Sequence, residues 1–125
     1  MEKQIRWGII GCGSISSKHA EAINRVASAV LVATADIIPE RAQRLAAKYG
    51  APYWYGDYNQ MLQRDDIDVV SVCVPSGLHG EITEAIAKSG KHVFCEKPIE
   101  ITKQAMDSMI QTCHDNQVKL GCVFQ

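Results

Sequence analysis

The sequence predicts a doubly wound α/β domain built on a parallel sheet. Short runs of β-branched and other apolar residues alternate with longer segments of helical periodicity, and no repeat or low-complexity linker interrupts the alternation. The 125 residues are 46% hydrophobic, which is enough for one core. Six strands separated by helices require right-handed crossovers, so we expect the strand order 3-2-1-4-5-6.

The first expected strand covers residues 5–10. The segment after it places four residues on one face of a helix: Ile15, His19, Ile23 and Val26. Residues 30–35 form the second strand, and the next helix begins at Pro39 and ends at Gly50. These elements give the β-α-β rhythm of a parallel sheet.

Residues 53–55 are a short third strand, and Asp57 with Gln60 resembles a capping box at the start of a further helix. Residues 68–74 are apolar almost throughout, as a parallel strand covered on both faces should be. The remaining expected elements are a helix over 79–89 ended by Gly90, a strand over 91–95, a helix over 102–116 and a strand over 118–124.

Charge and cysteine content narrow the class of partner. Thirteen basic and 14 acidic residues give a net charge of −1, which leaves no electrostatic footprint for nucleic acid or an anionic membrane. No segment approaches the roughly 20 apolar residues of a membrane span. Five scattered cysteines lack the spacing of a zinc or redox site, and we interpret them as buried, reduced thiols: Cys12, Cys73, Cys95, Cys113 and Cys122. We therefore expect a cytoplasmic protein with a small-molecule partner and no metal.

A glycine loop follows the first strand, where residues 8–16 read GIIGCGSIS. Gly11 permits a tight turn, and Gly13 allows the backbone to approach a pyrophosphate at the positive end of the following helix. The third position of the dinucleotide fingerprint is Ser16, which is small but not glycine. A glycine-rich turn in any α/β protein gives the same pattern, so the loop alone does not establish the site.

Asp36 strengthens the dinucleotide interpretation. It ends the second strand 20 residues after Ser16, where a carboxylate accepts hydrogen bonds from the adenosine ribose. A turn aspartate is the plainer alternative. Because Ile37 rather than an arginine follows and Asp36 would repel a 2′-phosphate, NAD is favoured over NADP. Arg41 is either a solvated helix residue or a phosphate ligand.

Three strand ends border the same crevice in this strand order, and they read GCGSIS, VPSGLH and CEKP. His79 begins a helix there, either as a site residue or as a surface histidine. Glu96 and Lys97 follow the fifth strand, so one side chain can face the cofactor and the other the substrate. Beside a cationic nicotinamide ring, the pKa of Lys97 would fall toward a range useful for proton transfer. An exposed Glu-Lys pair at a strand end is the alternative.

These motifs, above all KHVFCEKPIEIT, resemble the Gfo/Idh/MocA oxidoreductases over the whole chain, and Glu96-Lys97-Pro98 is the family's signature. The resemblance implies a Rossmann fold and an NAD(P)-dependent dehydrogenase acting on a sugar, inositol or sugar-nucleotide hydroxyl. It also implies site roles: Gly11, Gly13, Ser14 and Ile15 for the pyrophosphate, Asp36 for the adenosine ribose, Pro75 and His79 for the cofactor loop, Glu96 for the nicotinamide ribose, and Lys97 for the substrate.

Members of that family continue past the sixth strand into a second domain that holds most of the substrate pocket and the oligomer interface. We therefore expect residues 1–125 to be a cofactor domain that is inactive alone and belongs to a homo-oligomer at full length. Two other functions remain open. A non-catalytic NAD or sugar sensor would tolerate Lys97→Met, and an S-adenosylmethionine methyltransferase would leave Glu96-Lys97-Pro98 unexplained.

Overall fold

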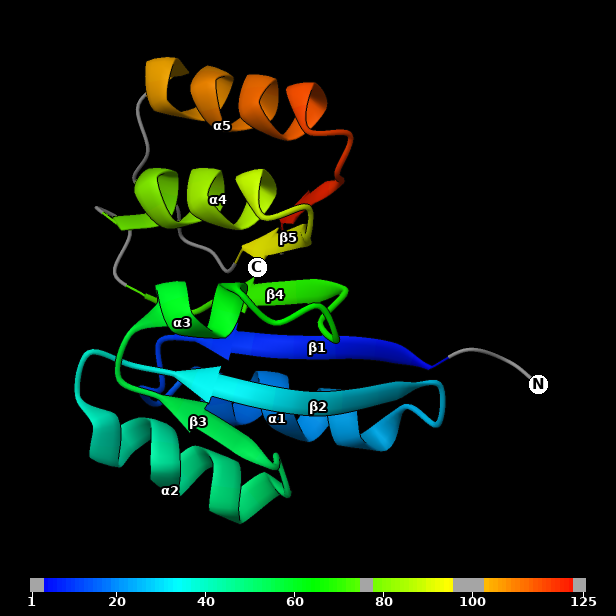
Figure 1. Cartoon of the computed structure of the whole chain (residues 1–125), viewed down its shortest axis with the longest axis vertical. Coiled ribbons are helices and arrows are strands. Elements are labelled where there is room, and N and C mark those ends of the chain that lie inside the picture. The colour runs from blue at the N-terminus through cyan, green and yellow to red at the C-terminus, as the bar shows by residue number, and fades with distance from the viewer. Residues whose placement is uncertain (1–3, 75–77, 96–102, 123–125) are drawn as a thin grey trace.

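The computed structural model describes residues 4–74, 78–95 and 103–122 and contains a parallel sheet with helices on both faces (Figure 1). The sheet has six strands in the order β3-β2-β1-β4-β5-β6, which confirms the predicted fold class and strand order. The strands are β1 (Ile5–Ile10), β2 (Ala29–Ala35), β3 (Tyr53–Tyr55), β4 (Val69–Val72), β5 (His92–Cys95) and β6 (Leu120–Cys122). The helices are α1 (Ser16–Arg25), α2 (Pro39–Tyr49), α3 (Tyr58–Leu62), α4 (His79–Lys88) and α5 (Lys103–Asp115).

Apolar side chains alternate between two layers, one on each face of the sheet. On one face, Val70 and Val93 contribute to a core that includes three fully buried or nearly buried helix residues: Met61 of α3, Ile86 of α4 and Met109 of α5. On the other face, Ile9 and Leu31 belong to a core with residues of α1 and α2: Ala20, Ile23 and Leu45. Figure 1 shows α1 behind β2 and α2 beside β3. The early helices and the late helices therefore cover opposite faces.

The expected boundaries hold closely for β1 and β3 and less well for β4. β4 covers Val69–Val72 instead of residues 68–74. The Asp68 backbone still bonds to the neighbouring strands, since its N–H donates to the Arg6 carbonyl at 2.7 Å and its carbonyl accepts from His92 N–H at 2.9 Å. Val74 lies in a bend before α4. In β2, Val32 is an extra residue, because Trp7 pairs with Leu31 whereas the next residue of β1 pairs with Ala33. This bulge gave no signal in the sequence.

The caps at Gly50 and Asp57 follow the expected chemistry, but the expected side-chain role of Gln60 is not observed. Gly50 ends α2 with a φ of 79°, in the left-handed region that glycine adopts at no steric cost. Asp57 caps α3 by accepting a hydrogen bond from the Asn59 N–H at 2.9 Å. The expected partner of the capping box, Gln60, is held through its backbone N–H, which donates to the Asp57 carbonyl at 3.1 Å.

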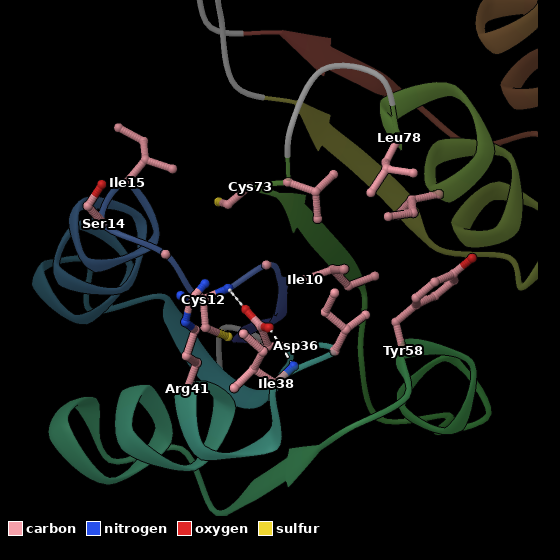
Figure 2. A pocket seen from close by; sticks show the side chains of 15 residues that line it. Ile10, Cys12, Ser14, Ile15, Asp36, Ile38, Arg41, Tyr58, Cys73 and Leu78 are labelled. Carbon is pink, nitrogen blue, oxygen red and sulfur yellow. Dashed lines mark hydrogen bonds between the residues drawn. The ribbon is translucent and has the colours of Figure 1, made fainter.

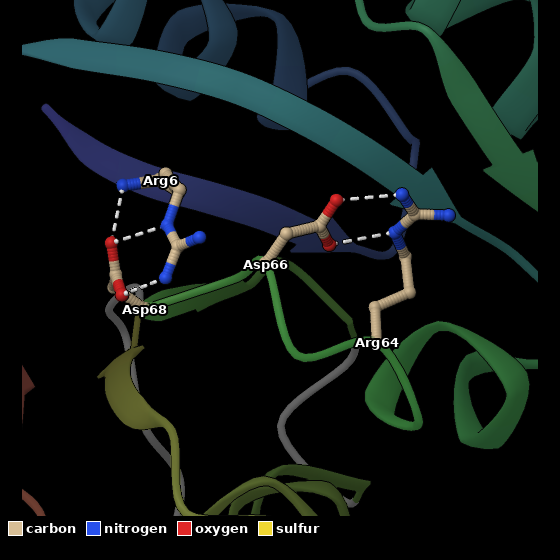
Figure 3. A network of polar contacts seen from close by, with 4 residues as sticks. All are labelled: Arg6, Arg64, Asp66 and Asp68. Carbon is tan, nitrogen blue, oxygen red and sulfur yellow. Dashed lines mark hydrogen bonds and ion pairs between the residues drawn. The ribbon is translucent and has the colours of Figure 1, made fainter.

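Two arginine–aspartate pairs lie near the amino ends of the central strands (Figure 3). The guanidinium of Arg6 donates to both carboxylate oxygens of Asp68, at 3.1 and 3.0 Å, and the Arg6 backbone N–H adds a third bond at 2.8 Å. Arg64 binds Asp66 at 2.8 and 2.7 Å, and its guanidinium carbon lies 3.6 Å from the ring centre of Tyr53. The Arg64 guanidinium holds the pKa of Asp66 below its usual range. These pairs connect β1, β3 and β4 far from the strand ends that follow.

The described cysteines agree with the expectation of reduced thiols. Cys73, Cys95 and Cys113 are buried and Cys12 is half-buried, and all four are free of disulfides. Across residues 4–74, 78–95 and 103–122, no helix is long and apolar enough to cross a membrane.

Candidate functional site

The carboxyl ends of β1, β2 and β4 are held together by backbone hydrogen bonds. Gly11 N–H donates to the Ala35 carbonyl at 2.8 Å, and Cys73 N–H donates to the Ile10 carbonyl at 2.8 Å. The loops that follow these three strands therefore begin side by side. This arrangement is the crevice in which ligands bind in open α/β sheets.

Gly11 is required for two physical reasons. Its φ is +91°, a value that L side chains rarely adopt. A Cβ at this position would also lie 2.8 Å from the backbone carbon and oxygen of Cys73 and 2.8 Å from Cγ1 of Val74. The first glycine therefore lets the loop turn and lets it pack directly against the end of β4.

Gly13 has the opposite surroundings. A Cβ built on Gly13 would meet no described atom within 4 Å, so it would project into open space. Ile15 is the N-cap of α1 and provides no side-chain hydrogen bond within the described part of the chain, and the first turn carries no acidic residue. The free N–H groups and the dipole of this helix end can therefore attract an anion.

Ser16 can take the place of the third glycine because it is small and its hydroxyl has a local acceptor. Its hydroxyl donates to the Gly13 carbonyl at 2.5 Å and its backbone N–H donates to the same carbonyl at 3.2 Å. The side chain is fully buried against the sheet. The departure from glycine at this position therefore leaves the close approach of α1 to the sheet intact.

Asp36 links the glycine loop to the end of β2. Its Oδ2 accepts a hydrogen bond from the backbone N–H of Cys12 at 2.7 Å, and its Oδ1 accepts one from Ile38 N–H at 2.8 Å (Figure 2). Each carboxylate oxygen has a second lone pair. Asp36 can therefore accept further hydrogen bonds from a ligand, although sequence reasoning missed that it also fixes the loop.

A pocket of about 470 Å³ opens over these strand ends (Figure 2). Its volume lies within the range of small-molecule sites. Five residues expected to contact the cofactor line it together: Gly11, Gly13, Ser14, Ile15 and Asp36. The remaining wall is mainly apolar, with Ile37, Ile38, Val74, Leu78 and Ile82. A polar floor with apolar walls suits a dinucleotide, whose phosphates and ribose need donors and acceptors and whose adenine needs an apolar slot.

Two further lining residues, Tyr58 and Arg41, add polar groups to this pocket. Tyr58 begins α3, and burial, together with the nearby Glu81 and Asp57, raises the pKa of its phenol. Arg41 lines the pocket and also a second hollow of about 460 Å³ with Arg44 and Lys48. The sequence left the role of Arg41 open and gave no signal for Tyr58, because nothing local shows that α3 packs against β2 and β3.

His79 is buried rather than exposed, so the surface alternative is wrong. Its side chain is 2% exposed, and Nε2 lies 2.8 Å from the Val74 carbonyl. Because a carbonyl only accepts, Nε2 must carry the proton. Nδ1 has no hydrogen-bond partner among the described residues. His79 does not line the pocket, and its geometry instead fixes the chain as it leaves β4.

Cys12, between the two loop glycines, is an inert thiol. Its Sγ donates to the Ala35 carbonyl at 3.3 Å. Burial, with the Asp36 carboxylate as a second cause, raises the pKa of the Cys12 thiol to about 12. The thiol is therefore neutral at physiological pH and is a poor nucleophile.

Pro75, Glu96, Lys97 and Pro98 lie outside the described residues. β5 ends at Cys95, which pairs with Val72 of β4. The roles of Pro75, Glu96 and Lys97 therefore stay predictions. Across the residues that are described, no group of three or more His, Cys, Asp or Glu side chains could hold a metal ion.

Comparison with known proteins connects this geometry to a family. The Gfo/Idh/MocA model, described as an oxidoreductase family with an NAD-binding Rossmann fold, matches residues 5–124. The chain is 35% identical over 120 residues to an inositol 2-dehydrogenase of Rhizobium meliloti, covering 96% of this chain and 36% of that protein. It is 36% identical over 107 residues to a myo-inositol 2-dehydrogenase of Thermotoga maritima, covering 86% of this chain and 32% of that protein.

Solved structures give the same result. The WlbA dehydrogenase from Bordetella pertussis, in complex with NADH and UDP-GlcNAcA, superposes with a TM-score of 0.90 at 34% identity, covering 97% of this chain and 37% of that one. An NAD binding oxidoreductase from Klebsiella pneumoniae also gives a TM-score of 0.90 at 34% identity, covering 97% and 34%. The chain thus spans about a third of the length of the relatives that it matches.

Proposed function

The chain belongs to the Gfo/Idh/MocA family of oxidoreductases with an NAD-binding Rossmann fold, and on that premise we propose that the whole protein is an NAD-dependent dehydrogenase. Its substrate carries a hydroxyl carbon of a sugar, inositol or sugar nucleotide. Relatives named as inositol dehydrogenases and a neighbour solved with NADH and UDP-GlcNAcA support this substrate class. Residues 1–125 supply the cofactor part and are inactive alone.

The observation that carries the proposal is the meeting of Gly11, Gly13 and Asp36 in one pocket at an uncapped helix end. The open space at Gly13 is the position that a pyrophosphate would take, against the N–H groups of Ser14 and Ile15. Asp36 would accept hydrogen bonds from the adenosine ribose through its remaining lone pairs. The acidic side chain also favours NAD over NADP, because a 2′-phosphate would face a carboxylate.

When bound, NAD supplies a nicotinamide ring that accepts a hydride at C4. The family resemblance assigns the remaining work to two residues after β5. Glu96 would hold the nicotinamide ribose, and Lys97 would take a proton from the substrate hydroxyl as the carbonyl forms. A lysine beside a cationic ring and partly removed from water has a lowered pKa, which suits this exchange.

His79 supports the site as a positioning residue. Its Nε2–H group holds the Val74 carbonyl, and Val74 lines the pocket next to Gly11. A histidine buried at the start of α4 therefore sets the course of the chain after β4. Its role in the cofactor loop is indirect in this proposal.

The rest of the whole protein would supply the substrate pocket and a homo-oligomer interface. We also propose a cytoplasmic location. The four described cysteines Cys12, Cys73, Cys95 and Cys113 form no disulfide, and thiols persist in reducing compartments. The balanced charge of the chain favours neither nucleic acid nor an anionic membrane as a partner.

The test is the rate of NADH formation by the whole protein with myo-inositol, scyllo-inositol and UDP-GlcNAcA as substrates. Lys97→Met should lower kcat by about 10²–10⁴-fold while leaving NADH affinity unchanged. Lys88→Met, an exposed lysine on α4, is the matched control and should behave as the unmodified protein. A whole protein that binds NADH, reacts with none of the three substrates and is unaffected by Lys97→Met is a sensor, and the catalytic proposal is then wrong.

A further inference from the structure

A second hollow borders the cofactor pocket on the side of α2. It has a volume of about 460 Å³ and is lined by the glycine loop, by Ser17 of α1 and by three basic residues of α2: Arg41, Arg44 and Lys48. We call it the α2 hollow. We propose that the α2 hollow is a phosphate-binding subsite, which receives a phosphate group carried on the adenosine ribose of the cofactor or a free phosphate ion. The inference rests on the proposed cofactor site but not on catalysis by Lys97.

The three basic residues lie on one side of α2 because their spacing follows the helical period. Arg44 comes three residues after Arg41, and Lys48 comes four residues after Arg44. Like charges at these spacings destabilise a helix, and a bound anion would remove that repulsion. Arg41 also stands in the first turn of α2, where the helix dipole disfavours a cation. The placement of these charges therefore favours an anionic ligand over a purely structural role.

The two arginines of the hollow differ from the other arginines of the chain. Arg6, Arg25 and Arg64 each pair with a carboxylate. Neither Arg41 nor Arg44 forms an ion pair within the described part of the chain. No aspartate or glutamate is among the described residues that line the hollow. The hollow therefore holds positive charge that no described carboxylate balances.

The α1 side of the hollow adds hydrogen-bond donors. Ser14 and Ser17 line it, and their hydroxyls can donate to phosphate oxygens. Gly13 leaves space beside them, since a Cβ there would meet no described atom within 4 Å. A phosphate monoester carries about two negative charges at neutral pH and three acceptor oxygens. It therefore matches a site that combines guanidinium groups, an ammonium group and hydroxyls.

The hollow adjoins the position assigned to the adenosine ribose. Four residues line both the hollow and the cofactor pocket: Cys12, Gly13, Ser14 and Arg41. Asp36 lines the pocket but not the hollow, and its Oδ2 accepts a hydrogen bond from Cys12 N–H at 2.7 Å. Figure 2 shows the Arg41 side chain directed from α2 toward the loop at Cys12. A phosphate on the 2′-oxygen of a ribose held by Asp36 would therefore lie within reach of the hollow.

Asp36 and the α2 hollow act in opposite directions on such a phosphate. The carboxylate repels it, which is the reason for the expected preference for NADH. The basic residues attract it, but the charged carboxylate masks their effect. Removal of that one negative charge should therefore turn the preference toward NADPH without any added cation. A basic helix face that is merely solvated would give no such change.

Calorimetric titration of the whole protein with NADH, NADPH and inorganic phosphate, at constant ionic strength, tests the proposal. In Asp36→Asn, NADPH affinity should rise by about tenfold or more over that of the unmodified protein. Addition of Arg44→Met or Lys48→Met should remove most of that gain. Arg25→Met removes the same charge from an exposed position on α1 outside the hollow, so it is the matched control and should keep the gain.

The titration with inorganic phosphate alone separates the two sources of the phosphate. Binding to the unmodified protein that Arg44→Met weakens and Arg25→Met does not would assign the hollow to free phosphate. A gain in NADPH affinity that needs Arg44 and Lys48, without binding of inorganic phosphate, would assign it to the cofactor. Either result supports the subsite. If Arg44→Met and Lys48→Met act no differently from Arg25→Met in both titrations, the proposal is wrong.

The two titrations also separate this proposal from the proposed function. The phosphate titration keeps Asp36 intact, so it does not depend on the folding of Asp36→Asn. An unmodified protein that binds no NADH would contradict the proposed function, whereas the response of phosphate binding to Arg44→Met would still decide on the subsite. Normal NADH binding with no effect of Arg44→Met or Lys48→Met in either titration would contradict the subsite alone.

Discussion

Replacing Gly11 by alanine should destabilise the fold by disrupting the packing of the glycine loop against the end of β4. The added Cβ would lie 2.8 Å from three atoms, the backbone carbon and oxygen of Cys73 and Cγ1 of Val74. Two of these atoms are backbone atoms of a chain held in the sheet, so they cannot move aside cheaply. The Gly11 backbone also has a φ of +91°, which strains any L residue.

The expected cost follows from these two terms. A left-handed conformation costs an L residue roughly 1–2 kcal/mol. Forcing an extra carbon into a packed site costs about 1–3 kcal/mol. Alanine has less conformational freedom than glycine in the unfolded chain, which offsets the loss by about 0.4–1 kcal/mol. Gly11→Ala should therefore lower the free energy of unfolding by about 1–5 kcal/mol, with a central value of about 3, against the roughly 5–15 kcal/mol of a typical domain.

Gly13→Ala is the matched control, because its Cβ would meet no described atom within 4 Å. This change should leave the free energy of unfolding within about 0.5 kcal/mol of the unmodified chain. It should weaken NADH binding, because the Cβ enters the space assigned to the pyrophosphate. Urea unfolding followed by circular dichroism measures the first quantity, and titration with NADH measures the second. A Gly11→Ala chain as stable as the unmodified one, or a Gly13→Ala chain with full NADH affinity, would refute the reasoning.

Three further predictions concern residues away from the pyrophosphate. Asp68→Asn should lower the urea midpoint of unfolding, because it weakens the bidentate ion pair with Arg6. NADH affinity should not change, because the pair lies far from the pocket. A loss of NADH affinity would contradict this prediction. The pKa of the Cys12 thiol is raised from its ordinary value of 9.0 to about 12 in the folded chain, so folding becomes less favourable as the pH rises above 9. Relative to Cys12→Ala, the free energy of unfolding of the unmodified chain should fall by up to about 2 kcal/mol between pH 8 and 10.5. Stability profiles of the two chains that run parallel over this pH range would refute the prediction. Burial lowers the pKa of Lys91, whose ammonium donates to the Leu62 carbonyl at 2.9 Å. The unmodified chain should therefore gain stability relative to Lys91→Met as the pH rises toward 10.5. Urea midpoints at pH 8 and 10.5 measure the pH effects of both Cys12 and Lys91.

The fold was predictable because its signals are local. Each strand is a short apolar run, and helix ends carry residues whose backbone preferences are known, such as Pro39 and Gly50. The bulge at Val32 could not be predicted, because it depends on how two strands 25 residues apart match their registers. The pair between Arg6 and Asp68 joins residues 62 apart and carries no local pattern.

The candidate site could be predicted at positions where its chemistry requires one particular type of residue. Gly13 and Asp36 stand at the positions that a dinucleotide requires, and both line the pocket. The sequence could not show that Gly11 is also pressed against Cys73, which follows only from the pairing of β1 with β4. It also could not show that His79 is buried, because burial depends on what packs over the start of α4.

The most direct test of the account is calorimetric titration of the 125-residue chain and its Asp36→Ala variant with NADH, NADPH and S-adenosylmethionine. Circular dichroism must first show that the variant is folded, because Asp36 also binds the backbone of Cys12 and Ile38. The account predicts saturable NADH binding that is weaker for NADPH, absent for S-adenosylmethionine and lost in Asp36→Ala. A folded chain that prefers S-adenosylmethionine, or that binds NADH equally well without the Asp36 carboxylate, would contradict it.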